Sequence, residues 1–383
     1  MTNSTGPVLQ CYSCNEEFPL DSCKWVCPCD GVLDIVRTSI FPRDQLSSRP
    51  WNFWRYHEAL AIGDDRPRAS LGEVITPLLP AKFRDMNVQF KLEYLLPSGS
   101  YKDRGVAVCI NQLLSHGITA VSEDSSGNAG ASTAAYAAAA GMRADIFVPE
   151  STSPAKINQV RIYGAQCQLV PGDRTASAAE AQKPREGNLY IGHSWSPFFA
   201  CGIKSVAFEI AEQSNWTPPD WIVTPAGGGS LVMGLIEGFR DLHSARYMTK
   251  LPRILVVQAE FCAPIHKAWT GGRSHVEAVE PQKTMAEGAA LPDPCRGTQV
   301  LEAIRAYGAS VMAVDEMELS SCWRDLAKVG IYVEPTSALA VAGAWLAKER
   351  DELIKEGEST VVLLTGHGLK TNPVYLRQGE EMA

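Results

Sequence analysis

Several features are missing from this chain of 383 residues, and each absence argues against a class of protein. The chain has no excess of basic residues: 35 Lys and Arg face 43 Asp and Glu, and the net charge of −8 argues against nucleic-acid or anionic-membrane partners. The alanine-rich residues 134–141 form the longest apolar run, which is far shorter than the roughly 20 residues needed to cross a bilayer. The first residues, MTNSTGPVLQ, have no basic segment before an apolar core, so we expect no signal peptide.

Motifs of several well-known sites are absent as well. The glycine-rich residues 224–230 are not followed by Gly-Lys, which excludes a Walker A loop, and they lack the spacing of a dinucleotide-binding loop. His57-Glu58 has no second histidine at helical spacing, which excludes a metalloprotease helix. A disulfide framework is not expected, because the cysteine count is eleven and six of them are scattered between Cys109 and Cys322. Free thiols fit a reducing cytosol, and we expect a cytoplasmic protein.

The chain does contain a cluster of cysteines near its start. Cys11 and Cys14 have the C-x2-C spacing of a zinc ribbon, in which four thiolates surround one tetrahedral ion. Cys27 and Cys29 are one residue closer than that spacing, and Cys23 with Cys27 is the alternative second pair. Two interpretations stay open: a structural zinc bound by Cys11, Cys14, Cys27 and Cys29, or a metal-free extension with spare thiols. Four sulfurs fill the coordination sphere of zinc, so such an ion has a structural role.

From Thr76 onward, short apolar segments alternate with amphipathic ones. Strands are predicted at residues 88–92, 120–123, 144–148, 166–170, 221–223, 254–258 and 360–364, and helices at 106–114, 127–140, 156–163, 204–212, 231–242, 318–328 and 337–348. This order predicts an α/β fold with parallel sheets covered by helices on both faces. Residues 36–75, rich in proline and tryptophan, are predicted to be a linker with a short amphipathic piece at 51–60.

Lys102 lies where a predicted strand gives way to a predicted helix, in the segment Pro97-Ser98-Gly99-Ser100-Tyr101-Lys102-Asp103-Arg104-Gly105. In open α/β sheets, ligands bind beyond the carboxyl ends of the strands. A cation at a helix N-terminus is mildly unfavourable, so this lysine needs a further reason to be there. Two interpretations follow: a solvated lysine, or an amine that bonds covalently to a ligand.

A polar loop also follows the predicted strand 120–123. Its residues Ser125, Ser126, Gly127 and Asn128 offer hydroxyls, an amide and backbone N–H groups at the start of a helix. Helix capping needs only one such side chain. The loop is therefore a candidate to hold a carboxylate or a phenolic oxygen.

Two further loops follow the predicted strands 221–223 and 360–364. The first contains Gly227, Gly228, Gly229 and Ser230, which let the backbone approach a phosphate at a helix N-terminus; a flexible turn is the alternative. The second contains Thr365, whose hydroxyl is placed to contact a ring nitrogen, whereas His367 is interpreted as a loop histidine without a catalytic task.

A lysine, an Asn loop, a glycine-rich loop and a strand-end hydroxyl together suit pyridoxal 5'-phosphate, which needs an amine, N–H donors and hydrogen-bond partners for its ring. The sequence here resembles the fold-type II pyridoxal-phosphate enzymes, specifically the threonine synthase family. The segments that carry the resemblance, besides 97–105, are Trp54-Arg55-Tyr56, Leu71-Gly72-Glu73, Thr76-Pro77-Leu78, Ser126-Gly127-Asn128, Ile146-Phe147-Val148-Pro149, Tyr163-Gly164-Ala165, Glu287-Gly288, Glu334-Pro335, Ser337-Ala338 and Thr365-Gly366.

The resemblance implies two doubly wound α/β domains of the tryptophan synthase β type with a short Cys-rich N-terminal extension. Residues 1–40 are expected to form the zinc-ribbon-like extension, 41–100 with 196–383 the large cofactor-binding domain, and 101–195 the small domain. A homodimer that acts on a small amino-acid substrate is expected as well.

The resemblance also implies the roles of individual residues. Lys102 forms the Schiff base with the cofactor and moves protons as acid and base. Asn128 contacts the ring 3-oxygen, Gly227, Gly228, Gly229 and Ser230 bind the phosphate, and Thr365 meets the pyridine nitrogen. Ser125, Ser126, Gly127 and Asn128 hold the substrate carboxylate, and Lys156, His193 and Lys204 are candidate contacts for an anionic substrate group.

The activity implied is that of a pyridoxal-phosphate-dependent carbon–oxygen lyase acting on phosphates, and threonine synthase is the first expectation: O-phosphohomoserine and water give threonine and phosphate. Ala226-Gly227-Gly228-Gly229-Ser230 is closer to the dehydratase form of the loop, and Leu96 and Ile75 depart from the residues usual in threonine synthases. The alternative is therefore a paralogue that performs β-replacement on phosphoserine or another activated amino acid, or a serine or threonine ammonia-lyase.

Overall fold

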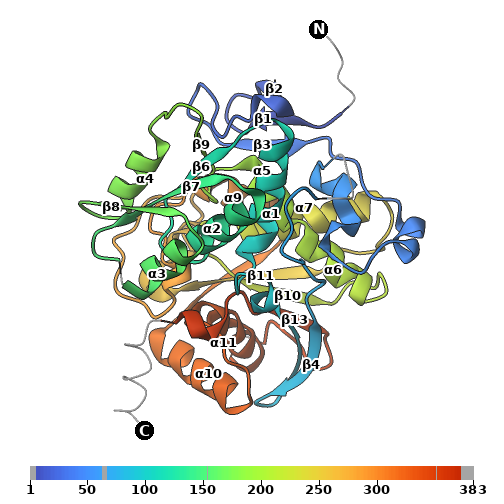
Figure 1. The fold of residues 1–383 in the computed structure, drawn as a ribbon. Coiled ribbons are helices and arrows are strands. Elements are labelled where there is room, and N and C mark those ends of the chain that lie inside the picture. Colours follow the sequence, from blue (N-terminus) through green and yellow to red (C-terminus); the bar gives the residue numbers. More distant parts are fainter. Residues whose placement is uncertain (1–5, 63–66, 153, 351, 372–383) are drawn as a thin grey trace. The chain divides into compact units, whose positions relative to one another are not determined.

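The computed structural model describes residues 6–62, 67–152, 154–350 and 352–371. Internal contacts divide the chain into two compact units: unit 1 comprises Met1–Ile75 and Leu96–Phe208, and unit 2 comprises Thr76–Leu95 and Glu209–Ala383. Figure 1 labels most of the helices and strands of each unit. Among the described residues, no helix combines the length and apolar character of a membrane span.

Unit 1 begins with a small antiparallel sheet in the order β2-β1-β3, formed by β1 (Val8–Cys11), β2 (Glu17–Pro19) and β3 (Leu33–Val36). The short 3-10 helices of this region are η1 (Leu20–Ser22), η2 (Arg43–Ser48) and η3 (Phe53–Leu60). The predicted amphipathic piece at 51–60 is therefore a 3-10 helix. The predicted linker is part of a packed core, because the buried ring of Tyr56 contacts Phe41 and Phe208.

The main sheet of unit 1 is parallel, in the order β8-β7-β6-β9. Its strands are β6 (Ala120–Glu123), β7 (Arg143–Pro149), β8 (Gln166–Val170) and β9 (Leu189–Tyr190), and the helices are α1 (Lys102–Ser115), α2 (Asn128–Ala140), α3 (Pro154–Ile162), α4 (Arg174–Gln182) and α5 (Pro197–Ile203). Helix α6 (Ser205–Gln213) includes the residue at which unit 1 ends.

The direction of winding in this sheet reverses at β6. From β6 the chain passes through α2 to β7 and through α3 to β8, and then returns through α4 to β9 on the opposite side of β6. Right-handed crossovers in opposite directions put α2 and α3 on one face and α4 on the other. The loops after β6 and β9 therefore meet at a topological switch point, where open α/β sheets bind ligands.

Unit 2 contains a six-stranded sheet in the order β12-β11-β10-β13-β5-β4, in which only the pair β4–β5 is antiparallel. Its strands are β4 (Leu78–Phe83), β5 (Met86–Lys91), β10 (Trp221–Pro225), β11 (Arg253–Ala259), β12 (Ser310–Val314) and β13 (Thr360–Leu363). Its helices are α7 (Ser230–Ser244), α8 (Pro264–Thr270), α9 (Gly297–Tyr307), α10 (Glu316–Lys328) and α11 (Pro335–Glu349), and its 3-10 helices are η4 (Glu93–Leu95), η5 (Glu260–Cys262), η6 (Glu287–Ala289) and η7 (Gly368–Lys370).

This sheet also has a switch point, between β10 and β13. The chain winds from β10 through β11 to β12 and returns through α10 and α11 to β13, beside β10. Helix α11 lies close against the sheet, as Figure 1 shows; a Cβ at Gly343 would stand only 2.5 Å from Val257 Cγ2. The loops that follow β10 and β13 are thus neighbours at the carboxyl edge of the sheet.

The predicted α/β fold with parallel sheets is confirmed, and most predicted elements lie within two or three residues of their observed bounds. The elements that were not predicted are β1–β4, α4, β9, α5, α8, α9 and β12. Some of them are short or exposed: β9 has two residues, and β4 is an edge strand that contains Pro80 and is exposed at Leu79. Such segments carry a weak apolar period.

The two compact units also differ in their boundaries from the domains expected above. Residues 41–75, 96–100 and 196–208 belong to unit 1, whereas the expectation assigned them to the large domain. The physical reason is side-chain packing: α5 lies against α1, and Cys201 Sγ contacts the carbonyl oxygen of Ala59 at 3.7 Å. Residues 1–40 likewise belong to unit 1.

A fully buried ion pair lies within unit 2. Lys91 Nζ, on β5, stands 2.6 Å from Glu209 Oε2, and both side chains are 0% exposed. The ammonium also donates to the carbonyl oxygen of Thr76 at 2.7 Å and to Gln213 Oε1 at 2.9 Å. These bonds compensate for the loss of hydration, but neither charge can lose its partner without a large cost.

We predict that Glu209→Gln lowers the free energy of unfolding by about 3 kcal/mol, because it removes the charge that stands 2.6 Å from the buried Lys91 ammonium. The measurement is urea denaturation followed by circular dichroism. The matched control is Glu277→Gln, which removes one member of the half-exposed pair Arg273–Glu277 and should leave the midpoint nearly unchanged. Equal midpoints for the two variants would contradict the prediction.

Candidate active site

The carboxylate of Asp103 fixes the loop that carries Lys102. Asp103 is 0% exposed, and its Oδ2 accepts from the backbone N–H of Ser98 at 2.7 Å. Its Oδ1 accepts from the hydroxyls of Ser98 and, at 2.6 Å, Ser132 on α2. One buried side chain thus holds the turn before α1, the first turn of α1 and helix α2 together. The residue next to it, Lys102, begins α1, four residues before the predicted start of that helix at Val106.

Aromatic rings surround the amine of Lys102. Its Nζ donates to the Tyr101 hydroxyl at 2.9 Å and lies 5.5 Å from the centre of the Phe199 ring, on α5. Phe199 fits there because residue 105 is glycine: a Cβ at Gly105 would stand 2.3 Å from the ring. The nearby Ser100 hydroxyl is fully buried and has no hydrogen-bond partner in the described part of the chain. It is therefore available to a ligand.

The loop 125–128 lies after β6, at the switch point of unit 1. Ser125 Oγ accepts from the backbone N–H of Gly127 at 3.2 Å, and α2 begins at Asn128 with no side chain capping it. The helix packs closely on this loop, because a Cβ at Gly130 would stand 1.9 Å from the carbonyl oxygen of Ser125. The backbone N–H groups of the first turn of α2 thus have no side-chain cap, which suits the binding of an anion.

Two buried acidic residues end β6 just before this loop. Glu123 Oε1 lies 3.0 Å from His193 Nδ1, and Glu123 Oε2 accepts from the backbone N–H of His193 at 3.1 Å. Asp124 accepts from the Tyr190 hydroxyl at 2.7 Å. Burial raises the pKa of Glu123 to about 7, and burial together with the charges of Lys102 and Arg174 holds the pKa of His193 well below its usual value. Neither of these two acidic residues was predicted from the sequence to belong to the site.

In unit 2, the loop after β10 forms the N-terminus of α7. Gly229 has φ +87°, and a Cβ on it would stand 2.4 Å from Val300. A Cβ at Gly227 would stand 3.1 Å from the Cα of Ala289. No side chain caps α7, which begins at Ser230, so the backbone N–H groups of its first turn have the geometry expected for a phosphate site.

Thr365 lies after β13, the strand that neighbours β10 at the switch point of unit 2. Its Oγ1 is 3.2 Å from the hydroxyl oxygen of Ser337, at the start of α11. The same hydroxyl oxygen accepts from the backbone N–H of Thr365 at 2.9 Å and of Gly366 at 3.0 Å. Ser337 therefore positions Thr365, a role that the sequence alone did not indicate.

Within each unit, the structure brings predicted residues together. In unit 1 the Lys102 segment and the loop 125–128 are joined through Asp103 and Ser132, and in unit 2 the glycine loop and Thr365 follow neighbouring strands. Of the candidate anion contacts, Lys204 is buried with its Nζ 3.0 Å from Thr38 Oγ1, and His193 pairs with Glu123. The side chain of Lys156 lies outside the described residues.

The N-terminal cysteines form a compact cluster. The sulfurs of Cys11, Cys14, Cys27 and Cys29 all lie within 4.8 Å of one another, and the neighbouring distances are 3.5–3.6 Å. A zinc ion with four Zn–S bonds of about 2.3 Å spaces its sulfurs about 3.8 Å apart. Cys23 is not part of the cluster, which favours the pairing of Cys27 with Cys29. The chemistry and spacing of the four thiols fit a structural zinc ion.

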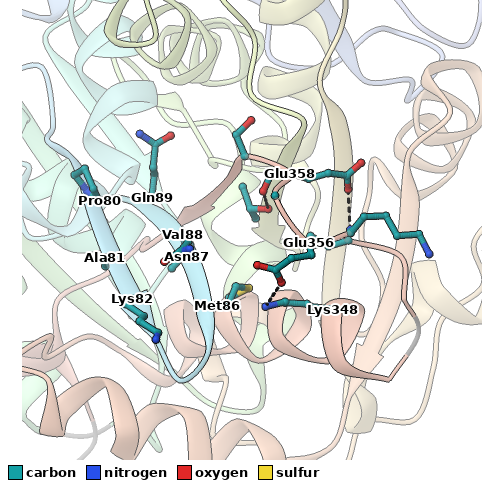
Figure 2. A pocket seen from close by; sticks show the side chains of 15 residues that line it. Pro80, Ala81, Lys82, Met86, Asn87, Val88, Gln89, Lys348, Glu356 and Glu358 are labelled. Carbon is teal, nitrogen blue, oxygen red and sulfur yellow. Dashed lines mark hydrogen bonds and ion pairs between the residues drawn. The ribbon is translucent and has the colours of Figure 1, made fainter.

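Two surface hollows of unit 2 lie away from the candidate site residues. Figure 2 shows one of about 520 Å³ beside the β4–β5 hairpin, in which Lys348 Nζ pairs with Glu356 at 2.9 Å and Glu358 accepts from the Lys355 N–H at 2.9 Å. Another, of about 620 Å³, lies beside α8. None of the candidate site residues lines either hollow.

Comparison with known proteins identifies the family. A family model described as "Pyridoxal-phosphate dependent enzyme" matches residues 69–366. The chain belongs to the fold-type II pyridoxal-phosphate-dependent enzymes. It is 31% identical to the threonine synthase of Methanocaldococcus jannaschii, over 97% of this chain and 95% of the relative. It is 32% identical to the threonine synthase of Methanosarcina acetivorans, over 97% of this chain and 94% of the relative.

Solved structures show the same fold. A fungal L-serine ammonia-lyase from Rhizomucor miehei superposes with a TM-score of 0.70 at 25% identity, over 80% of this chain and 98% of that one. Threonine deaminase isoform 2 from Solanum lycopersicum superposes with a TM-score of 0.69 at 22% identity, over 81% of this chain and 88% of that one. This similarity shows the fold alone. The fold class, the enzyme family and the cofactor expected from the sequence are thereby confirmed.

The residues of this chain fit pyridoxal phosphate in their chemistry. The cofactor has an aldehyde, a phosphate and a pyridine ring. The amine of Lys102 suits the aldehyde, the unpartnered Ser100 hydroxyl can accept or donate a hydrogen bond, and the uncapped first turn of α7 offers backbone N–H groups to a phosphate. The assignment of individual residues to parts of the cofactor remains a proposal.

We predict that the purified protein contains one zinc ion per chain and that Cys27→Ser reduces this to near zero, because a thiolate ligand is lost and three ligands hold a structural ion poorly. The measurement is metal content by plasma mass spectrometry after dialysis. Cys23→Ser is the matched control, since Cys23 is a nearby buried thiol outside the cluster, and it should retain the metal. Zinc absent from the wild type, or equal in the two variants, would refute the assignment.

Proposed function

We propose that the protein is a threonine synthase-type enzyme, which converts O-phosphohomoserine and water into threonine and phosphate. The observation that carries this proposal is the Lys102 segment, Gly-Ser-Tyr-Lys-Asp-Arg-Gly, in a chain whose curated relatives over nearly its whole length are threonine synthases. The anchoring of the segment by Asp103 supports the proposal, because a covalent lysine must be held in place.

When bound, pyridoxal phosphate supplies an electron sink for the carbanion formed at Cα of an amino acid. In the proposal, the amine of Lys102 would hold the cofactor through its aldehyde, and the same amine would remove and return the substrate protons. Asn128 binds the ring 3-oxygen, and the loop of Gly227, Gly228, Gly229 and Ser230 binds the phosphate through backbone N–H groups.

The loop of Ser125, Ser126, Gly127 and Asn128 is proposed to hold the substrate carboxylate, and Thr365 to meet the pyridine nitrogen. The partner of the Thr365 hydroxyl in the described structure is the neutral hydroxyl of Ser337. The Thr365 hydroxyl is therefore neutral as well. A neutral hydroxyl does not stabilise a protonated pyridine nitrogen, so the cofactor is a weak electron sink. This favours elimination and replacement at Cβ or Cγ over transamination. A homodimer in the cytoplasm remains part of the proposal.

A second candidate function has its own support. The glycine loop reads Ala-Gly-Gly-Gly-Ser, the form expected for a dehydratase, and a serine ammonia-lyase is among the structures of the same fold at 25% identity. The alternative is an enzyme that eliminates or replaces the β-substituent of serine, threonine or phosphoserine. The lysine, the cofactor and the carboxylate loop keep the same roles in both candidates.

We predict that the wild-type protein is yellow and that Lys102→Ala loses the absorption band of the lysine-bound cofactor, because no other amine is proposed to bond the aldehyde. Borohydride should bleach the wild-type band and link the cofactor to the peptide that contains Lys102, as mass spectrometry would show. The retained far-ultraviolet dichroism of the variant is the control for folding. A wild-type protein that stays colourless with added cofactor would sink the proposal.

We predict that incubation with O-phosphohomoserine releases phosphate and threonine in equal amounts, because each turnover breaks one Cγ–O bond and adds one water at Cβ. The same assay with phosphoserine and with serine separates the candidates. Turnover of these two substrates without phosphate release from O-phosphohomoserine would favour the second candidate. The Lys102→Ala variant is the control for uncatalysed release.

A further inference from the structure

A buried acid–histidine pair lies near the Phe199 ring, as the amine of Lys102 does, and has no role in the proposed reaction so far. Glu123 ends β6, and His193 follows β9, so the two residues flank the switch point of unit 1. The side chains are 1% and 11% exposed, and 3.0 Å separates Glu123 Oε1 from His193 Nδ1. A carboxylic acid buried to this extent costs free energy, which makes a purely structural role unfavourable.

The pair lies near the reactive side of the unit. The His193 ring contacts the Phe199 ring, with 5.9 Å between their centres, and Lys102 Nζ lies 5.5 Å from the centre of the same ring. Glu123 immediately precedes the loop 124–128, part of which is the proposed carboxylate loop. The backbone N–H of His193 also donates to Glu123 Oε2, so the carboxylate fixes both the backbone and the ring of the histidine.

The second nitrogen of the ring, Nε2, makes no hydrogen bond to any residue that the structure describes. A histidine whose Nδ1 is held by a carboxylate and whose Nε2 is open has the arrangement of a general acid or base. We propose that His193 is a second acid–base residue of the reaction, which donates a proton to the departing substituent of the amino acid, and that Glu123 orients and recharges it. This inference rests on the second candidate function, in which the departing substituent is a hydroxyl group that needs a proton.

The proton transfer balances as follows. The bond between the substrate carbon and the oxygen of its substituent breaks, and its electron pair stays with the oxygen. The proton on His193 Nε2 passes to that oxygen, and the proton of the Glu123 carboxyl passes to Nδ1. The pair ends with one proton fewer and regains it from water. No oxidant or reductant is needed.

The charged and titratable neighbours of the pair come from several elements. Lys102 on α1 and Arg174 at the start of α4 are positive, and Asp124 and Tyr190 lie beside the pair at the ends of β6 and β9. Cys109 on α1 is a neutral neighbour whose pKa burial raises to about 12. Because the pKa of Glu123 is about 7, the pair holds its transferable proton below that pH and loses it above.

The test compares substrates whose leaving groups differ in their need for a proton. Serine must lose hydroxide, which requires an acid, whereas β-chloroalanine loses chloride, which does not. We expect His193→Gln to slow elimination from serine by about 10²–10⁴-fold, the range of general acid catalysis, and to affect β-chloroalanine far less. Exchange of the Cα proton with deuterated water should persist in the variant, because Lys102 performs it.

Two further variants separate proton donation from structural support. Tyr190→Phe removes the hydrogen bond to the neighbouring Asp124. It should change the rates of elimination from serine and from β-chloroalanine by the same factor. Glu123→Gln keeps a hydrogen bond to His193 but cannot transfer a proton, so it should imitate His193→Gln. In the cofactor-free protein, the ¹⁵N signals of the His193 ring should show the pair gaining a proton as the pH falls through about 7, and Glu123→Gln should lack this step.

Equal losses on both substrates, no elimination from serine by the wild type, or an unchanged titration in Glu123→Gln would overturn the inference while leaving the threonine synthase proposal intact. A wild-type protein that carries the cofactor but exchanges no Cα proton would overturn the proposed function and this inference together. If His193→Gln still exchanges the Cα proton but selectively loses elimination from serine, the result supports both the second candidate function and the inference.

Discussion

The structure depends on the right-handed crossover that joins parallel strands. In each unit the chain winds one way from a central strand and then back, so that the winding direction reverses beside β6 in unit 1 and beside β10 in unit 2. Strand ends on the two sides of such a reversal must be neighbours. The loop 125–128 and His193 follow β6 and β9, and the glycine loop and Thr365 follow β10 and β13. Handedness alone therefore brings together residues that are about 70 to 140 positions apart in the chain.

Topology places loops, but single buried groups set their geometry. Asp103 does this in unit 1: its carboxylate joins the turn at Ser98 to α2 at Ser132. A negative side chain in the first turn of a helix is favourable, and it offsets the unfavourable placement of Lys102 at the same N-terminus. Ser337 has the corresponding role in unit 2, where one hydroxyl holds the backbone of Thr365 and Gly366. Both supports hold a proposed reactive group without being proposed to touch the cofactor.

The sequence predicted those features that have local causes. The strands at 120–123 and 166–170 agree with the observed bounds of β6 and β8, because their apolar residues lie between clear turn signals. The candidate site loops were proposed because glycine and hydroxyl residues at a strand end are unusual. Features with tertiary causes could not be found in this way. Glu123 is the last residue of an apolar strand, and its pairing with His193 follows only from the position of β9 beside β6. The packing of residues 41–75 in unit 1 likewise depends on ring contacts across the chain.

The acid–histidine pair and the neutral hydroxyl proposed for the ring nitrogen have related consequences. A weak electron sink stabilises the carbanion poorly, so elimination proceeds best when the substituent leaves readily. Phosphate leaves without help, but a hydroxyl group must first be protonated. A proton donor beside the lysine removes that restriction and extends the same scaffold from phosphate esters to hydroxyl substrates. In this proposal the acid–histidine pair decides which leaving groups this chain can remove, whereas the cofactor and its lysine serve both candidate reactions.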